Sequence, residues 1–402
     1  MQTIHRFFAA LILIPLCVLY GDEPYPISAS PFGINSHVPD RALIEKIAEV
    51  DIAWIRCDFN WFMIEPNANQ WTWAIFDTLT AAARDNGLNI FATLAYPPSW
   101  ANNGGTHHDP PSRTEDWEDF VFTTVNRYKS TIKHWGMWNE PNLEHFWTGT
   151  RQQYIDSILI AGHKAAKRAD SACFVIGPEL AHLQSGQFDE WLRDVLTQAA
   201  GYIDIISHHC YNDDVKTIMR RLAGPTYFWE PQAVRKIIID AGAGDKEFWL
   251  AETGWHTDEV SERVQADNYV ELLDSMLATP WWHRTFFYEI RDDPNIADKW
   301  GILTSDTKPK EAYTVYKEYI QAHTVTFVHT YAEHAGGASK MQHASKYLHM
   351  RWPFRSSALQ HLPFFAAFDY RGRKVTSKNC GSGCWICVPC QASLDVRQAG
   401  CE

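Results

Sequence analysis

The chain has 402 residues, which is enough for one large core of about 250–300 residues plus additional segments. Hydrophobic residues account for 46% of the chain and charged residues for 21%, the balance of an ordinary globular protein. The formal net charge of -12 argues against nucleic acid or an anionic membrane as a partner, because phosphate binding requires basic patches.

The first element in the chain has the pattern of an export signal. His5 and Arg6 precede an apolar run over residues 7–20, and Gly21 and a polar stretch follow it. The run is too short for a comfortable membrane span. We therefore expect residues 1–21 to be a signal peptide, with an uncleaved anchor as the alternative. The protein would be secreted, periplasmic or on the cell surface, with no membrane partner beyond this signal.

Short apolar and aromatic runs then alternate with longer amphipathic stretches. Runs rich in apolar residues at every position are typical of strands that are covered on both faces. The predicted strands are 32–36, 52–58, 89–95, 133–138, 173–177, 202–208, 247–252 and 284–290. The predicted helices are 39–50, 73–86, 114–130, 151–168, 187–200, 231–241, 261–277 and 309–322.

This alternation predicts an α/β fold, a (β/α)8 TIM barrel that occupies residues 22–322. An open, doubly wound sheet is the alternative. Such a sheet would normally carry a glycine-rich phosphate-binding turn after its first strand, and Gly33-Ile34-Asn35-Ser36 is not one. In a barrel, the chemistry lies at the carboxyl ends of the strands, so residues at those ends are the candidates for a site.

Residues 323–402 do not continue the pattern and are predicted to form a short, irregular, Cys-rich tail. Its cysteines are Cys380, Cys384, Cys387, Cys390 and Cys401. Their spacing fits no defined metal site, disulfides are an alternative in an exported protein, and a poorly ordered segment is another. We assign this tail no function. Three other cysteines stand in apolar runs and are expected to be buried thiols: Cys57, Cys173 and Cys210.

Two predicted strands end in a glutamate. Trp138-Asn139-Glu140-Pro141-Asn142 closes the fourth strand, and Ala251-Glu252-Thr253-Gly254 closes the seventh. The fourth and seventh strands face each other across an eight-stranded barrel mouth. Two carboxyl groups in this arrangement are what glycoside hydrolysis requires, and a separation of about 5–5.5 Å favours double displacement with retention. A helix-capping role for Glu140 is the alternative.

The segments around these glutamates resemble those of clan A glycoside hydrolases, and the wider pattern is closest to glycoside hydrolase family 39. The supporting segments occur in the expected order across nearly the whole predicted barrel. They are 61–66, 70–71, 96–101, 138–142, 207–211, 251–255 and 287–292. The resemblance implies a retaining glycosidase that acts on a polysaccharide or an oligosaccharide, with Glu140 as the acid/base and Glu252 as the nucleophile.

The same resemblance implies substrate-binding roles for further residues. Arg56 would hydrogen-bond the nucleophile, and Asn139 would bind the sugar 2-hydroxyl. His209 and Tyr211 would orient the nucleophile and the sugar. The side chains expected to line the sugar subsites are His37, Trp100, Trp147, Trp255 and Tyr288. Each has a structural alternative: an ion pair for Arg56, a core position for His209, and packing for the tryptophans.

The chain also departs from the family. Exo-acting β-xylosidases of family 39 carry a β-sandwich domain after the barrel, and only about 80 residues with little strand pattern follow here. This departure suits an endo-acting enzyme on an exopolysaccharide, and an exo-acting β-xylosidase is the alternative. Glu289, in the eighth strand, is either a third functional carboxylate or an outward-facing residue.

Two other classes of function remain as alternatives. One is a carbohydrate-binding barrel without catalysis, although binding alone requires neither glutamate. The other is a metal-dependent hydrolase that uses His107, His108, His208 and His209. Barrel metallohydrolases usually place paired histidines on the first strand, where this chain offers only His37. We expect no metal and no cofactor.

Overall fold

The computed structural model describes residues 25–225, 231–323, 367–368 and 374–375. The predicted signal peptide and the five cysteines of the final segment lie outside the described residues. No helix in the described part of the chain is both long and apolar enough to cross a membrane.

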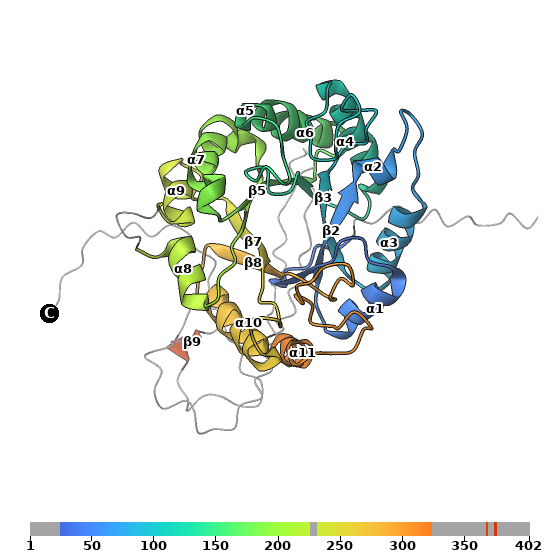
Figure 1. Ribbon diagram of the computed structural model, residues 1–402. Coiled ribbons are helices and arrows are strands. Elements are labelled where there is room, and N and C mark those ends of the chain that lie inside the picture. The colour runs from blue at the N-terminus through green and yellow to red at the C-terminus, as the bar shows by residue number, and fades with distance from the viewer. Residues whose placement is uncertain (1–24, 226–230, 324–366, 369–373, 376–402) are drawn as a thin grey trace, which may run out of the picture.

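Eight parallel strands close into a barrel in sequence order, with β1 pairing with both β2 and β8. Figure 1 shows the helices as a ring around these strands. The strands are β1 Phe32–Asn35, β2 Trp54–Asn60, β3 Asn89–Ala95, β4 His134–Met137, β5 Phe174–Ala181, β6 Ile205–His209, β7 Glu247–Thr253 and β8 Trp282–Phe287. The predicted (β/α)8 barrel is confirmed, and the open sheet is excluded.

The helices follow the strands on the outside of the barrel. They are α1 Arg41–Glu49, α2 Trp61–Ile64, α3 Ala74–Asp85, α4 Thr114–Tyr128, α5 Arg151–Gln153, α6 Ala161–Ala169, α7 Phe188–Ala199, α8 Val215–Ala223, α9 Val234–Asp240, α10 Glu262–Leu277 and α11 Glu311–His323. The π-helix η1, Tyr154–Ile160, joins α5 to α6, and the 3-10 helices η2 and η3 flank α7 at Gln184–Gly186 and Ala200–Tyr202. A further pair of short antiparallel strands, β9 Ala367–Phe368 and β10 Lys374–Val375, pairs separately.

Two apolar layers hold the barrel together. The larger lies between strands and helices, and it includes the buried side chains Ile55, Phe59 and Trp117. The smaller fills the inside of the barrel with Trp54, Phe91, Ile176, Ile205, Trp249, Ala251 and Phe286. Because side chains alternate along a strand, the residues two and four positions after Trp54 also face inward, which directs Arg56 and Asp58 toward the barrel mouth.

Two β-bulges near the carboxyl end of the barrel bear on the site, and the pairing of β7 with β8 is irregular as well. On β5, Pro178 pairs with Ser207 and Leu180 pairs with His208, so Glu179 is an extra residue. On β7, the pairing moves from Leu250 to Glu252 while β6 advances by one residue. A bulge changes the face to which the next side chain points. Both bulges therefore re-aim glutamates at this end of the barrel.

The three cysteines predicted to be buried thiols, Cys57, Cys173 and Cys210, are free and buried, which confirms that prediction.

Candidate active site

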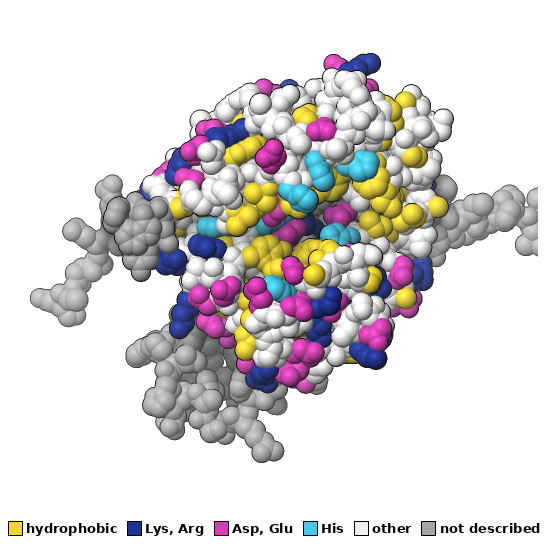
Figure 2. All heavy atoms as spheres, viewed as in Figure 1, with side chains coloured by type: hydrophobic (Ala, Val, Ile, Leu, Met, Phe, Trp, Pro, Cys, Tyr) yellow, Lys and Arg dark blue, Asp and Glu magenta, His cyan; other side chains and the backbone are white. Residues whose placement is uncertain are grey.

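A pocket of about 430 Å³ opens among the residues that follow the carboxyl ends of the strands. Figure 2 views this end of the barrel, where acidic and histidine side chains gather around a central hollow. The predicted site residues that line the pocket are His37, Arg56, Asn139, Glu140, Tyr211, Glu252 and Tyr288. The sequence-based choice of strand ends thus selects residues that the fold brings together.

Glu140 reaches the pocket through a sharp change of backbone direction after β4. Trp138 and Glu140 both have positive φ angles, 80° and 43°, in the region that non-glycine residues rarely adopt. The Glu140 backbone N–H donates to the carbonyl oxygen of Glu179, 3.0 Å away, which fixes this conformation. The Glu140 residue is 8% exposed. Burial raises the pKa of its carboxyl group, and the charge on Glu252 raises it further, while His209 acts in the opposite direction.

Glu252 enters the pocket because of the bulge on β7. Trp249 and Ala251 both face the inside of the barrel, so an unbroken strand would point Glu252 outward toward the helices. Arg56 Nη1 donates to Oε1 of Glu252 at 2.6 Å, and the Tyr211 hydroxyl donates to Oε2 at 2.9 Å. Burial alone would raise the pKa of Glu252, but the charges of His209 and Arg56 outweigh it, and the pKa lies below its usual value.

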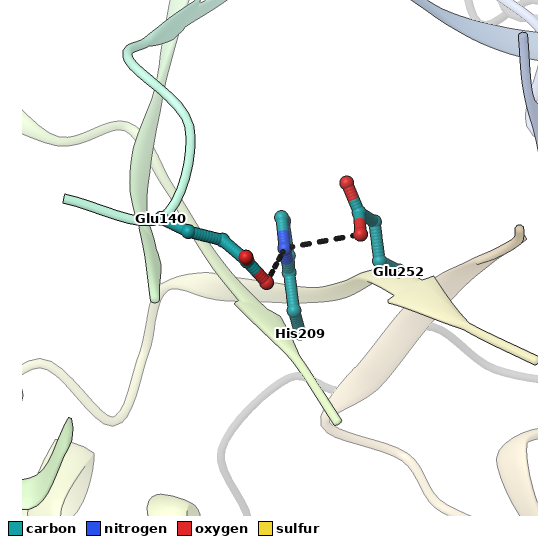
Figure 3. Close-up of side chains that lie close together, drawn as sticks. All are labelled: Glu140, His209 and Glu252. Carbon is teal, nitrogen blue, oxygen red and sulfur yellow. Dashed lines mark hydrogen bonds and ion pairs between the residues drawn. The ribbon is translucent and has the colours of Figure 1, made fainter. Parts of the chain in front are cut away.

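His209 lies between the two glutamates, as Figure 3 shows. Its Nδ1 donates to Oε1 of Glu140 at 2.9 Å and lies 3.4 Å from Oε2 of Glu252. Burial would lower the pKa of this imidazole, but Glu252 and Glu140 raise it to about 9. His209 is therefore an imidazolium at neutral pH, which makes it a cation shared by both carboxylates.

The two carboxylates lie close enough to act on one bond. One carboxylate oxygen from each glutamate and Nδ1 of His209 all lie within 4.8 Å of one another. Among the described residues, this is also the one group that could hold a metal ion. The four histidines of the metallohydrolase alternative do not form such a group, since His209 alone among them belongs to it.

A second hydrogen-bonded chain forms another wall of the pocket. His37 Nδ1 lies 2.9 Å from Oδ2 of Asp58, and its Nε2 lies 2.9 Å from the Tyr288 hydroxyl and 3.7 Å from Glu289. The His37 side chain is 48% exposed, and its partial removal from water lowers the pKa; Asp58 more than compensates, and the pKa of His37 rises to about 9. Burial raises the pKa of Glu289 to about 7. Its contact with His37, a pocket residue, places the Glu289 carboxyl group on the side of the site, directly behind the pocket wall.

The structure corrects the prediction for three tryptophans. Trp147 and Trp255 are 2% and 3% exposed and pack in the core, where their indole N–H groups donate to the carbonyls of Thr150 and Asp213. Trp100 is half-buried, donates to the carbonyl of Glu65, and is not among the residues that line the pocket. Aromatic residues near strand ends pack under the loops as readily as they face a ligand, which misled the prediction.

Several pocket residues were missed at the sequence level. They are Asn35, Ser36, Asp58, Tyr96, Phe146, Ala181, His182, Leu183 and Trp300. Asn35, Ser36 and Tyr96 stand at or directly after the ends of β1 and β3, so strand-end placement could have found them. Asp58 lies two residues before the end of β2, on the same face as Arg56. Trp300 lies in the long connection between β8 and α11, where no strand pattern marks it.

The family model described as glycosyl hydrolases family 39 matches residues 47–251, just over half of the 402-residue chain. The chain belongs to family 39. The match covers β2 to β6 and most of β7, including Arg56 and Glu140, and it ends one residue before Glu252.

Curated relatives of this family 39 chain match a limited stretch. A β-xylosidase of Caldicellulosiruptor saccharolyticus is 35% identical over 147 residues, 32% of this chain and 29% of that protein. A β-xylosidase of Geobacillus stearothermophilus is 29% identical over 112 residues, 25% of this chain and 21% of that protein. The chain thus spans less than a third of the length of the curated relatives that it matches.

Solved structures share the family 39 barrel at lower identity. A family 39 glycoside hydrolase from Bacteroides cellulosilyticus WH2 superposes with a TM-score of 0.58 at 17% identity, covering 74% of this chain and 63% of that one. A monomeric β-xylosidase from Caulobacter crescentus CB15 gives a TM-score of 0.57 at 18% identity, covering 74% and 69%. At such identities these structures support the fold alone.

Proposed function

We propose that this chain is a retaining glycoside hydrolase that cleaves O-glycosidic bonds of an oligosaccharide or polysaccharide by double displacement. One observation carries the proposal. Two glutamates from facing strands lie with carboxylate oxygens within 4.8 Å of one another, and their surroundings shift their pKa values in opposite directions. Opposed shifts separate an acid from a nucleophile. An inverting enzyme needs room for a water beside its base, between the two carboxyl groups. The close approach of Glu140 and Glu252 leaves no such room.

In the first step, Glu252 attacks the anomeric carbon while Glu140 gives its proton to the glycosidic oxygen. The bond from the anomeric carbon to that oxygen breaks, the leaving group departs as an alcohol, and a glycosyl ester forms on Glu252. In the second step, Glu140 takes a proton from water, and the oxygen of that water displaces Glu252 from the sugar. The second step returns a proton to Glu140 and releases Glu252 as a free carboxylate, so both residues end in the state in which they began.

The contacts of Glu252 explain how it stays ionised before attack. Arg56 and Tyr211 donate to different oxygens of its carboxylate. Arg56 Nη2 also donates to Oδ1 of Asn139 at 2.8 Å. This contact occupies the amide oxygen of Asn139. The NH2 group of the same amide can then donate to a sugar hydroxyl.

The roles of the glutamates can be tested with an activated aryl glycoside and azide. Glu252→Ala should lose about 10⁴-fold or more in kcat, and azide should rescue it as a glycosyl azide of inverted configuration. Glu140→Ala should give an azide product of retained configuration. Exposed Glu144→Gln serves as the matched control and should retain full activity. Full activity of Glu252→Gln or Glu140→Gln would refute the assignment, and any turnover by the wild type eliminates the binding-only alternative.

A β-xyloside is the first substrate to test, because the two curated relatives described above are β-xylosidases. Measuring hydrolysis of aryl β-xylosides beside a panel of polysaccharides, with product sizing, separates exo action from endo action. Release of single sugars from chain ends supports an exo-acting β-xylosidase. A ladder of longer products supports an endo-acting enzyme.

The sequence of residues 1–21 supports a further proposal, that the protein is exported. His5, Arg6 and the apolar run that follows have the order of a signal peptide. Expression with this segment intact should yield protein outside the cytoplasm whose amino-terminal sequence begins near residue 22. Full-length protein that remains in the cytoplasm would contradict this proposal.

A further inference from the structure

Glu179 is a buried carboxylate to which the two steps above give no role. Its side chain is 0% exposed. Its Oε2 accepts hydrogen bonds from Nε and Nη2 of Arg56, at 2.9 and 2.6 Å, and lies 3.7 Å from Nε2 of His209. A buried charge is unfavourable unless it is paired. Here both of its partners are also the cations that contact the catalytic glutamates.

The bulge on β5 is what inserts this side chain into the barrel. Glu179 is the extra residue between Pro178 and Leu180, and its φ angle is 53°, in the left-handed region. Its carbonyl oxygen accepts the backbone N–H of Glu140. The same residue therefore fixes the main chain of the acid/base and the side chain that holds the nucleophile.

The neighbouring strand leaves space for the carboxyl group. Gly136 lies on β4, beside β5, and a Cβ added there would lie 2.1 Å from Oε1 of Glu179. A side chain at this position would force the carboxyl group of Glu179 to move. The glycine on β4 and the bulge on β5 thus act together to put one carboxylate behind the site.

Arg56 illustrates what this carboxylate does. A guanidinium group is planar and donates from fixed directions. Glu179 occupies the edge formed by Nε and Nη2, which leaves Nη1 to donate to Glu252 at 2.6 Å and to Asn35 at 2.9 Å. With the Nε edge fixed, rotation of the guanidinium away from the nucleophile is blocked.

We propose that Glu179 is a positioning residue for the double displacement, one that orients Arg56 on the nucleophile and keeps His209 protonated between the two catalytic glutamates. This inference rests on the proposed function. It predicts that the negative charge of Glu179, and not only its shape, sets the pH range over which the enzyme works.

The groups that face this charge come from several elements. Arg56 on β2 and His209 on β6 contact it, and the Arg56 charge also interacts with Asp58. The charge of Glu179 also acts on Tyr154 of η1. Burial and this charge raise the pKa of the Tyr154 phenol, so its hydroxyl stays neutral. His208, next to His209, is neutral because burial lowers its pKa. Glu140 and Glu252 complete the set.

The test is Glu179→Gln, which keeps the shape and removes the charge. We expect kcat/KM to fall about 100-fold, as for small misplacements of reacting groups. Loss of a nearby negative charge lowers the pKa of each remaining acid. Both limbs of the pH profile of kcat/KM should therefore move to lower pH, by roughly one unit. Glu179→Asp, which restores the charge, should return both limbs most of the way.

Asp170→Asn is the matched control. Asp170 pairs with Lys133 at 2.6 Å just before β5 and β4, at the opposite end of the barrel. Asp170→Asn breaks an ion pair ahead of β5, the strand that carries Glu179, and should leave both limbs in place. If Glu179→Gln lowers activity but leaves the limbs unmoved, Glu179 is only structural and the inference is overturned.

A second measurement does not depend on turnover. The ring nitrogens of His209 can be titrated by NMR in the resting protein, with the spectrum of His209→Gln assigning the signal. Glu179→Gln should lower the pKa of His209, and an unchanged titration overturns the inference even if the enzyme is active.

Absence of turnover in the wild type would refute the proposed function and leave this titration to decide on Glu179. If Glu179→Gln does not fold, Gly136→Ala displaces the same carboxyl group and takes its place.

Discussion

At the scale of single residues, Glu140 and Glu252 carry the same chemical group in different surroundings. Glu252 has two cations close to it, and their attraction exceeds the effect of burial, so its pKa falls. Glu140 feels the same two charges but hydrogen-bonds only His209, and burial dominates, so its pKa rises. The charge on Glu252 contributes to the raised pKa of Glu140. In the proposed first step, formation of the glycosyl ester removes that charge and its contribution. The pKa of Glu140 then falls, so its carboxyl group stays ionised and can act as the base of the second step.

Asp58 is predicted to control the titration of His37. Because the folded pKa of His37 is about 9, above the unfolded value of about 6.5, the stabilisation from this contact is fully present below pH 6.5. It is lost as the pH rises through about 9. Asp58→Asn removes the largest cause that raises this pKa, so the unfolding free energy should fall less steeply between pH 6.5 and 9. Urea unfolding at several pH values measures this slope.

The control for this prediction is Asp85→Asn, which breaks an exposed contact with Arg41 on the surface. It should leave the slope unchanged. An NMR titration of the His37 ring gives an independent reading. If His37 titrates at the same pH in the wild type and in Asp58→Asn, the prediction is wrong.

The sequence identified some of these residues and concealed others for physical reasons. Glu140 and Glu252 were visible because each ends an apolar run. Asp58 stands two residues after Arg56 and could have been found from strand alternation. Glu179 could not, because it lies beyond the predicted strand 173–177 and faces the barrel interior only through the bulge on β5. The position of a bulge depends on how a strand pairs with its neighbours. The sequence of one strand does not contain that information.

At the scale of secondary-structure elements, the contact between β1 and β8 closes the barrel. Gly33 pairs with Phe286, and a Cβ at Gly33 would lie 2.5 Å from the Phe286 ring. Gly33→Ala forces that ring to move within the inner core and should destabilise the fold by about 1–3 kcal/mol. Urea denaturation followed by tryptophan fluorescence gives the free energy of unfolding.

Gly201→Ala is the comparison for this prediction, because no atom lies within 4 Å of the Cβ it would add. It should change the unfolding free energy by less than about 0.5 kcal/mol. If both substitutions change the unfolding free energy equally, the loss at Gly33 does not come from the close contact with Phe286.

All eight strands and their order followed from the sequence, because each predicted strand and helix pair forms one unit of the barrel. Two helices were missed. Helix α2 has four residues, which is too short for a periodic pattern. Helix α8 carries a detectable signal, since Asp214 caps it and Val215, Ile218 and Leu222 form its buried face. It was overlooked within the long connection between the sixth and seventh strands.

At the scale of the whole molecule, the structure predicts that residues 25–323 are sufficient for the barrel and its pocket. All pocket residues lie within this range. Helix α11 completes it, since the Tyr316 hydroxyl donates to the Gly33 carbonyl and Tyr319 contacts Asp274 on α10. A chain of residues 25–323 should unfold cooperatively and retain the kcat/KM of the full chain.

A chain of residues 25–310, which lacks α11, provides the contrast. It loses the buried side chains Tyr313, Tyr316, Tyr319 and Ile320, and we expect no cooperative unfolding transition. If both truncated chains behave alike, α11 does not have the role that its contacts suggest. The outline of the barrel was predictable from the sequence, but the shape of the pocket was not, because connections such as the one that carries Trp300 determine it.

The closed order of the strands also bears on when activity first appears during folding. His209, Glu140 and Glu252 belong to different strands, and Arg56 reaches Glu252 across 196 positions of the chain. No fragment of contiguous strands shorter than β2 to β7 contains the complete set. Contacts between such distant positions form late and slowly, because long loops must close first. If the proposed function holds, a newly made chain is inert toward glycans until nearly the whole ring has assembled, and the onset of activity marks the end of folding.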